Sequence, residues 1–321
     1  MEIRRSASGT AGVPDILGNK LSITVIILTF NEEIHIERCL TRIAPLVERI
    51  VVVDSFSTDR TVEIAKRLGA DVCQRSFKHQ AEQFQWAQES CGISTDWVLR
   101  LDADEYLEPA LIQEIRERLG SLAEEITGVD FKLKVIFKGH WIRYGGYYST
   151  ILTRMWRTGA GQYEQRWMDE KIVLTRGRSQ RVGDGDLVDE NLKDIGWWTD
   201  KHNRYATRQM VDFINLEYGL FVSDNRSARQ SNHHNWLKRL LRNHVFGRSP
   251  LYWRSALYFI YRYVIRLGFL DGRRGFVWHF LQGFWFFVLI DAKIEEARDF
   301  IEEHGSPAFM EHLKTHYSIE L

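Results

Sequence analysis

Three short apolar segments in the first third of the chain each end at a polar residue. The segments Ile23–Leu28, Arg49–Val53 and 97–101 are followed by Thr29, Asp54 and Asp102, respectively. Short apolar runs rich in β-branched residues are typical of buried strands. The carboxyl ends of parallel strands meet at one edge of a sheet, where α/β proteins bind their ligands. We therefore expect the three polar strand ends to converge on one crevice.

Helical patterns separate these strands. Apolar residues recur at helical spacing over Glu33–Leu46, and a second helix is expected over Arg60–Leu68, ended by Gly69. Strands that alternate with helices predict an α/β fold with a doubly wound, mostly parallel sheet. The alternating segment Val129–Phe137 predicts a smaller antiparallel region, and from Asn191 onward the pattern is mostly helical.

The bulk composition limits the choice of partners. The chain has 321 residues, enough for one large α/β domain with an appendage, and its 43 basic and 43 acidic residues cancel. Net charge therefore gives no indication of nucleic-acid binding. Three cysteines without CxxC spacing argue against a disulfide framework and a structural zinc site, and they fit a reducing cytosol. Residues 1–20 are polar and lack a secretory apolar region, so we expect a disordered leader.

The sequence Asp102-Ala103-Asp104 predicts a metal site. Mg²⁺ and Mn²⁺ prefer oxygen ligands and are commonly held by one or two carboxylates together with phosphate oxygens of the substrate. The alternative is a solvated acidic turn. A haloacid-dehalogenase-type phosphatase also carries an Asp-x-Asp motif, but here Tyr106 replaces the expected Thr or Val, and the motif follows two earlier β-α units. No G-x-G-x-x-G or P-loop motif follows the first strand.

Several segments in order resemble the inverting family-2 glycosyltransferases, enzymes of the GT-A fold that include lipopolysaccharide-core and exopolysaccharide glycosyltransferases. The resemblance extends over roughly Leu21–Ala292. It rests on the segments Leu28–Glu33, Val53–Thr61, Gln83–Ala87, Leu101–Glu105 and Leu267–Gly272. It implies a GT-A catalytic domain over 21–230 and a helical basic and aromatic tail over 231–321.

The resemblance also implies roles for individual residues. Thr29, Asn31, Glu32 and Asp54 would bind the nucleoside, with Ser57 and Asp59 shaping that pocket and Gln83 and Gln85 facing the donor. Asp102 would contact ribose or metal, and Asp104 would bind Mg²⁺ or Mn²⁺. Taken alone, Asn31 and Ser57 could be helix caps, and both glutamines could be solvated helix residues.

Glycosyl transfer with inversion needs a carboxylate to accept the proton of the attacking hydroxyl. The candidates are Glu170 and Asp169, because the family often has His-Glu before a basic residue where this chain has Asp169-Glu170-Lys171. We expect Glu170 to be the base and Asp169 to be its rival. A surface salt-bridged glutamate is the alternative.

Lys201, His202 and Arg204 lie close together near the start of the helical region. Cations beside a diphosphate stabilise the charge that develops as the bond to it breaks, so these side chains are candidates for donor or acceptor binding. A solvated cationic helix face would explain them equally well.

The neutral chain contains a strongly basic segment between Trp236 and Arg274, with nine basic residues and one acid. Arg254, Arg262 and Arg266 fall at helical spacing and predict a basic stripe suited to an anionic bilayer surface. The aromatic density favours lipid over nucleic acid. The apolar run Gly275–Ala292 is shorter than a full span, which predicts an interfacial segment, although burial against the domain or a dimer partner remains open.

The sequence thus predicts a metal-dependent inverting glycosyltransferase that uses a nucleotide-diphosphate sugar, with a UDP-sugar as the expected donor. The expected acceptor is a glycan or lipid-linked molecule of cell-envelope polysaccharide or lipopolysaccharide synthesis. We expect the protein in the cytoplasm, peripheral on the inner membrane face and attached through 236–292. A catalytically silent nucleotide-sugar-binding or scaffold protein is the alternative from another class.

Overall fold

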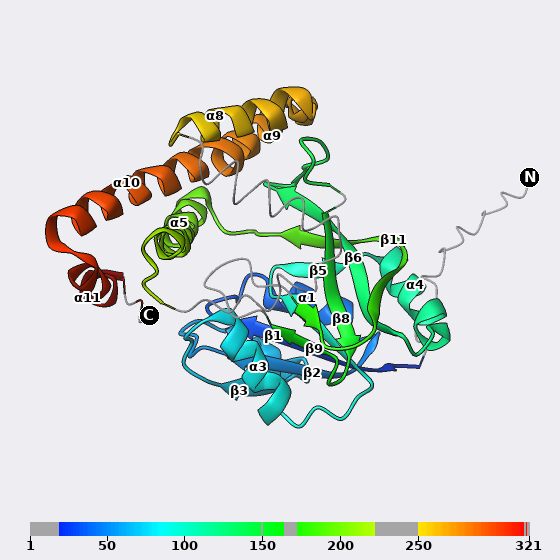
Figure 1. The fold of residues 1–321 in the computed structure, drawn as a ribbon. Coiled ribbons are helices and arrows are strands. Elements are labelled where there is room, and N and C mark those ends of the chain that lie inside the picture. Colours follow the sequence, from blue (N-terminus) through cyan, green and yellow to red (C-terminus); the bar gives the residue numbers. More distant parts are fainter. Residues whose placement is uncertain (1–18, 149, 164–171, 222–249, 318, 320–321) are drawn as a thin grey trace, which may run out of the picture.

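The computed structural model describes residues 19–148, 150–163, 172–221, 250–317 and 319 of the chain. A curled sheet with flanking helices forms one part, and long C-terminal helices lie across one end of it (Figure 1).

Nine strands form the main sheet, in the order β3-β2-β1-β4-β8-β6-β11-β5, with β7 paired to β6. They are β1 (Leu21–Thr29), β2 (Val47–Asp54), β3 (Asp71–Gln74), β4 (Trp97–Asp102), β5 (Glu105–Leu107), β6 (Ile126–Phe137), β7 (His140–Trp141), β8 (Thr150–Arg157) and β11 (Arg178–Glu190). The first four in spatial order are parallel, β8 is antiparallel to β4 and β6, and β6 is parallel to β11. Strands β1, β2, β4, β6 and β11 therefore end at the same edge. Strands β9 (Gly161–Tyr163) and β10 (Ile172–Leu174) form a separate antiparallel pair.

Helices cover both faces of the parallel half. They are α1 (Ile36–Ile43), α2 (Thr61–Arg67), α3 (Gln80–Ser90) and α4 (Pro109–Arg118), with a short turn η1 (Leu119–Ser121). Apolar residues of α1, α2 and α4 share one buried cluster with alternate residues of β1, whereas α3 packs in a second cluster with Ile26 and Val51. Helix α2 ends as predicted, because Gly69 has a φ of +80°.

The C-terminal part is helical. It contains α5 (Ile195–Tyr218), α8 (Trp253–Ile260), η3 (Tyr261–Ile265), η4 (Gly268–Asp271), α9 (Gly272–Phe280), η5 (Leu281–Trp285), α10 (Phe286–His304) and α11 (Ser306–Tyr317). Helices α5, α10 and α11 share a buried cluster of their own. Helix α8 packs against η5, so residues 253–285 double back as a helical hairpin, which we call the C-terminal hairpin.

Buried polar contacts attach the C-terminal hairpin to the sheet. The Asp271 carboxylate accepts hydrogen bonds from the backbone N–H groups of Arg143 and Tyr144, at 3.0 Å for each residue's shorter bond, and contacts the fully buried His279 ring at 3.2 Å. Trp278 packs against Phe137 at the end of β6, with a ring separation of 5.2 Å. The C-terminal hairpin is therefore packed firmly against this end of the sheet.

The predicted α/β class, with a parallel sheet, an antiparallel extension and a helical C-terminal segment, is confirmed. The predicted basic stripe is wrong. Arg254 is buried and paired with Asp291, and the Arg262 guanidinium lies 3.6 Å from the centre of the Tyr147 ring, facing the domain. Arg266 alone of the three is exposed, because Asp291 of α10 draws Arg254 inward and the Tyr147 ring packs against Arg262.

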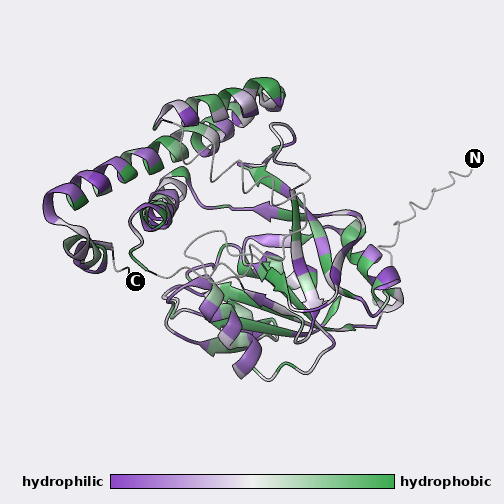
Figure 2. Cartoon of the chain, viewed as in Figure 1, coloured by the Kyte–Doolittle hydropathy of each residue, from purple (hydrophilic) through white to green (hydrophobic). Residues whose placement is uncertain are grey.

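The exposed surface of the C-terminal hairpin, which we call its outer face, carries many apolar side chains instead, and Figure 2 shows hydrophobic and hydrophilic residues mixed along its helices. Its exposed side chains include Trp253 (72% exposed), Leu257, Val264, Ile265 (66%) and Phe276. Within the described residues, one helical stretch, Gly268–His304, is long and apolar enough to cross a membrane by length and composition.

Candidate active site

The three predicted strand ends lie side by side. Thr29 is opposite Asp54 in the register of β1 and β2, and Leu28 is opposite Asp102 in the register of β1 and β4. The parallel sheet thus brings together three polar strand ends that are far apart in the sequence.

Asp54 is fully buried and organises the loops at two of these strand ends. Its carboxylate accepts hydrogen bonds from the Thr29 hydroxyl at 3.0 Å, the Ser57 backbone N–H at 2.9 Å and Gln74 Nε2 at 3.1 Å. Every one of these bonds is internal, so Asp54 holds Thr29 and Ser57 in place.

The loop after β1 is clamped to the loop after β2. Asn31 adopts a φ of +55°, a region that asparagine tolerates, and its side-chain oxygen accepts from the Thr58 N–H at 2.8 Å. The Asp59 carboxylate accepts from Glu33 N–H and from Thr61. Burial alone would raise the pKa of Asp59, but these hydrogen bonds hold it below its usual range. Hydrogen bonds therefore connect the residues predicted to bind the nucleoside into one surface, which we call the wall around Asp54. It consists of Thr29, Asn31, Asp54, Ser57 and Asp59.

The two predicted glutamines take different places on α3. Gln83 is fully buried, and its amide donates to the Ser55 hydroxyl at 3.3 Å and to the Arg75 carbonyl at 3.2 Å. Gln85 instead donates to Glu89 one turn away on the same helix. Gln83 adjoins the wall around Asp54, whereas Gln85 makes contacts of an ordinary helix surface.

A cavity of about 290 Å³ lies beside this wall, beneath the C-terminal hairpin. Its polar end is lined by Asp102, Asp104, Glu105, Asp189, Asn191, Lys193, Asp194 and Lys201. Its other end is lined by the end of β6 and by aromatic residues of α5 and α9. The cavity thus has a charged end and an aromatic end.

Asp104 is held in position at the charged end by Asn191, whose Nδ2 donates to Asp104 Oδ2 at 2.8 Å. Asn191 is itself fixed, because its Oδ1 accepts from the Lys193 N–H at 2.9 Å. The adjacent Asp102 faces two arginines instead, with Arg100 at 3.3 Å and Arg154 at 3.6 Å. The two acids of the motif consequently have different surroundings.

The charged end concentrates carboxylates around one ammonium group. Burial and the neighbouring Asp104 raise the pKa of Asp189 to about 7. Burial opposes ionisation of Lys201, but Tyr205 and the carboxylates of Asp104, Asp189 and Asp102 raise the pKa of its ammonium group, so it stays charged. Asp102 is ionised as well: burial would raise its pKa, and Arg100, Arg154 and Lys201 together lower it.

These residues fit a Mg²⁺ or Mn²⁺ ion of the kind that shares its coordination with phosphate. No group of three or more His, Cys, Asp or Glu side chains among the described residues has the geometry of a complete metal cage. Hard cations that bind nucleotides need only one or two carboxylates, with water and phosphate completing the shell. Asp104 has a fixed orientation, and its second oxygen accepts no hydrogen bond from the described residues. The pKa of Asp189 is raised by burial and then by repulsion from Asp104, and a divalent cation would relieve that repulsion.

Lys193 joins the two parts of the site. Its ammonium donates to the Asn31 carbonyl and to Glu32 Oε1, each at 2.8 Å, while the residue lines the cavity. Lys201 and His202, two of the candidates for donor or acceptor binding, also line the cavity. Arg204, the third candidate, is exposed and does not line it. Asp169 and Glu170 lie outside the described residues.

Sequence reasoning missed Asp189, Asn191, Lys193, Trp278 and Gln282. Asp189 had only a weak signal, because just two apolar residues, Leu187 and Val188, precede it, whereas longer apolar runs precede Asp54 and Asp102. The two hairpin residues had none, since only the packing of α9 and η5 against β6 brings them to the cavity.

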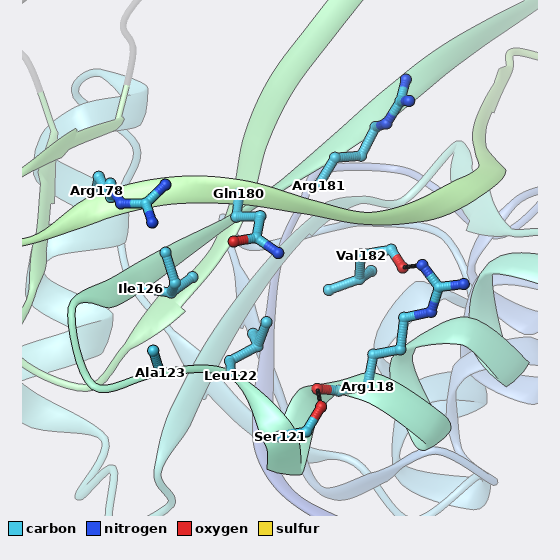
Figure 3. A pocket seen from close by; sticks show the side chains of 9 residues that line it. All are labelled: Arg118, Ser121, Leu122, Ala123, Ile126, Arg178, Gln180, Arg181 and Val182. Carbon is cyan, nitrogen blue, oxygen red and sulfur yellow. Dashed lines mark hydrogen bonds between the residues drawn. The ribbon is translucent and has the colours of Figure 1, made fainter.

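A second hollow, of about 270 Å³, lies at the opposite ends of β6 and β11 (Figure 3). Its arginines are engaged by neighbours: Arg118 donates to the Val182 carbonyl at 2.8 Å, Arg178 pairs with Glu125 and Arg181 pairs with Asp184. None of the residues predicted for the site lines it.

The fold and the site define the class of this protein. It is an α/β domain that has carboxylates at its strand ends and a cavity beside them. Residues 24–174 match the family described as glycosyl transferase family 2, so this part of the chain is a glycosyl transferase family 2 domain. The match favours glycosyl transfer over the phosphatase alternative.

Similar proteins bear related names. An uncharacterized glycosyltransferase of Rickettsia typhi is 36% identical over 118 residues, covering 36% of this chain and 40% of that protein. The lipopolysaccharide core biosynthesis glycosyltransferase LpsC of Rhizobium meliloti is 27% identical over 197 residues, covering 59% of this chain and 70% of that protein. The chain thus spans less than half the length of the Rickettsia relative.

Among solved structures, glucosyl-3-phosphoglycerate synthase of Mycobacterium tuberculosis, in complex with Mn²⁺, uridine diphosphate and phosphoglyceric acid, is 27% identical. The similarity covers 36% of this chain and 43% of that chain, with a TM-score of 0.29.

Proposed function

We propose that the protein is a metal-dependent inverting glycosyltransferase that takes its sugar from a nucleotide-diphosphate donor, with a UDP-sugar as the first candidate. The observation that carries this proposal is the charged end of the cavity, where the fixed Asp104 faces Lys201 beside the wall around Asp54. The wall would hold the nucleoside, and the charged end would hold the diphosphate.

In this proposal the acceptor oxygen attacks the anomeric carbon while the bond from that carbon to the diphosphate oxygen breaks. The electron pair leaves with the nucleoside diphosphate, and the acceptor proton passes to Glu170, or to its rival Asp169. Lys201 and Lys193 stabilise the growing negative charge on the leaving group. A Mg²⁺ or Mn²⁺ ion on Asp104, with Asp102 or Asp189 beside it, would supply further neutralisation of that charge.

We also propose that the acceptor is a glycan or lipid-linked molecule and that the protein docks on the cytosolic membrane face. The apolar outer face of the C-terminal hairpin supports docking, and the exposed Arg266, Arg273 and Arg274 suit anionic headgroups. The single acid among residues 253–285, Asp271, is buried beneath them. Attachment would then come from apolar insertion, with the arginines as an electrostatic supplement.

Donor hydrolysis in the absence of acceptor tests the enzyme claim against the silent-binder alternative. We expect the wild type to release UDP slowly from UDP-glucose, UDP-galactose or UDP-N-acetylglucosamine with Mn²⁺, and Asp104→Asn to lose about 10²-fold or more. Asp184→Asn is the matched control, because that side chain is 82% exposed, pairs with Arg181 and does not line the cavity. Equal release by wild type and Asp104→Asn would contradict the proposal.

A further inference from the structure

The aromatic end of the cavity is chemically distinct from the charged end. Phe137, Tyr147, Trp198 and Trp278 line it, together with the aliphatic residues Val135 and Ile136. The rings are mutually packed, with separations of 5.2 Å between Phe137 and Trp278 and 5.6 Å between Tyr147 and Trp278. Such walls bind flat or apolar surfaces and have little to offer a diphosphate.

Polar groups are set among these rings. Trp278 Nε1–H is shielded from solvent and has no hydrogen-bond partner in the part of the chain that the structure describes. Gln282, one turn further on, hydrogen-bonds to the His202 side chain. Burial lowers the pKa of His202 to about 4, so its ring is neutral. Its Nδ1 donates to the Trp198 carbonyl at 2.8 Å, so the ring fixes Gln282 and Trp198 in place and leaves the Gln282 amide as the group that can reach a ligand hydroxyl.

This combination matches the two-sided chemistry of a sugar. A pyranose ring presents an apolar C–H face, which packs on aromatic rings, and a rim of hydroxyls, which need donors and acceptors at fixed positions. Leaving a buried donor such as Trp278 Nε1–H without a partner costs about 1–3 kcal/mol, which favours a small movement of the Trp278 side chain that lets a ligand hydroxyl reach it.

We propose that the aromatic end is an acceptor subsite that binds one pyranose ring, with Trp278 and Gln282 of the C-terminal hairpin as its specificity-determining residues. The inference rests on the proposed function, which assigns the charged end to the donor and leaves this end to the acceptor. The hairpin residues Trp278 and Gln282 line the cavity, while Phe276 and Phe280 of the same helix are exposed. A sugar in the subsite therefore lies directly beneath the outer apolar face.

Saturation-transfer NMR with methyl glycosides of glucose, galactose and mannose, in the presence of UDP and the diamagnetic ion Mg²⁺, tests the subsite. We expect saturation of the ring C–H protons of at least one glycoside by the wild type, and at least a fivefold loss in Trp278→Leu. Gln282→Ala, a half-buried position, should change the relative signals of the three glycosides.

Trp285→Leu is the matched control. Trp285 is a tryptophan of the same hairpin that packs on Trp198 at 6.2 Å but does not line the cavity. Equal signal loss in both tryptophan variants, or no signal from any glycoside with the wild type, would overturn the subsite. Calorimetric binding of UDP with Mn²⁺, measured in parallel, reports on the donor end alone, so a failure of the proposed function is distinguishable from a failure of this inference.

Discussion

Asn191 Nδ2 donates to Asp104 Oδ2 at 2.8 Å and thereby ties the residue after β11 to the motif after β4. The two residues are far apart in the sequence, and the hydrogen bond fixes the orientation of the carboxylate that is the firmest candidate for the metal. A ligand that is held in this way loses little freedom on binding a cation.

Replacing Asn191 should weaken metal binding without removing the ligand itself. We expect Asn191→Ala to reduce Mn²⁺ affinity by about 10- to 100-fold in the presence of UDP, as is typical when the partner of a metal ligand is lost. Electron paramagnetic resonance of free Mn²⁺ measures this directly. Asn203→Ala, an exposed position on α5, is the control and should leave the affinity unchanged; an unchanged affinity in Asn191→Ala would remove Asn191 from the metal site.

The identity of the base is tested by two isosteric substitutions. Glu170→Gln should lower sugar transfer by about 10²- to 10⁴-fold, because the acceptor proton then has no carboxylate to receive it. Binding of UDP with Mn²⁺ should stay as in the wild type. If Asp169→Asn shows the larger loss instead, the roles of the two residues are exchanged, and if neither variant is impaired the base lies elsewhere.

The apolar face of the C-terminal hairpin should govern membrane attachment. Trp253→Glu combined with Ile265→Glu should release the protein from vesicles containing phosphatidylglycerol, because both side chains are largely exposed and would have to carry charge into the interface. Sedimentation with vesicles measures the bound fraction. The matched control is Leu216→Glu on α5, at a position 69% exposed but outside the hairpin; equal release by this variant would show that the hairpin has no special role.

His202 gives a prediction about pH and stability. Because burial lowers its pKa from the usual 6.5 to about 4, the unfolded chain binds a proton between these two values that the folded protein does not. Stability therefore falls as pH decreases through this window. We expect His202→Gln to lose about 2 kcal/mol less than the wild type between pH 7 and pH 5, measured by urea unfolding. An identical pH dependence in the two proteins would contradict this assignment.

The sequence predicted the parallel half of the fold well, because each strand there is a short apolar run that ends in a polar residue. It also placed Thr29, Asp54 and Asp102 at one edge, since parallel register follows from alternation of strands and helices. The prediction that Arg254 and Arg262 belong to an exposed basic stripe was wrong, because residue spacing does not reveal which face of a helix packs against the rest of the protein. Their partners, Asp291 and Tyr147, are distant in sequence.

The cavity itself was beyond sequence reasoning for a similar reason. Its charged end depends on Asp189, near the end of the long strand β11, and on Asn191, which follows that strand; β11 has an irregular register against β6. Its aromatic end depends on Trp278, which only the docking of the C-terminal hairpin brings to Phe137. Tertiary packing between distant segments decides both ends.

Calorimetric titration of UDP in the presence and absence of Mn²⁺ tests the central claim most directly. The account predicts that the wild type binds UDP at least tenfold more tightly with Mn²⁺, and that Asp104→Asn loses this gain while Asp184→Asn keeps it. Binding of UDP that is equally tight with and without Mn²⁺, or unchanged in Asp104→Asn, would contradict the assignment of the strand-end cavity as a metal-dependent nucleotide-sugar site.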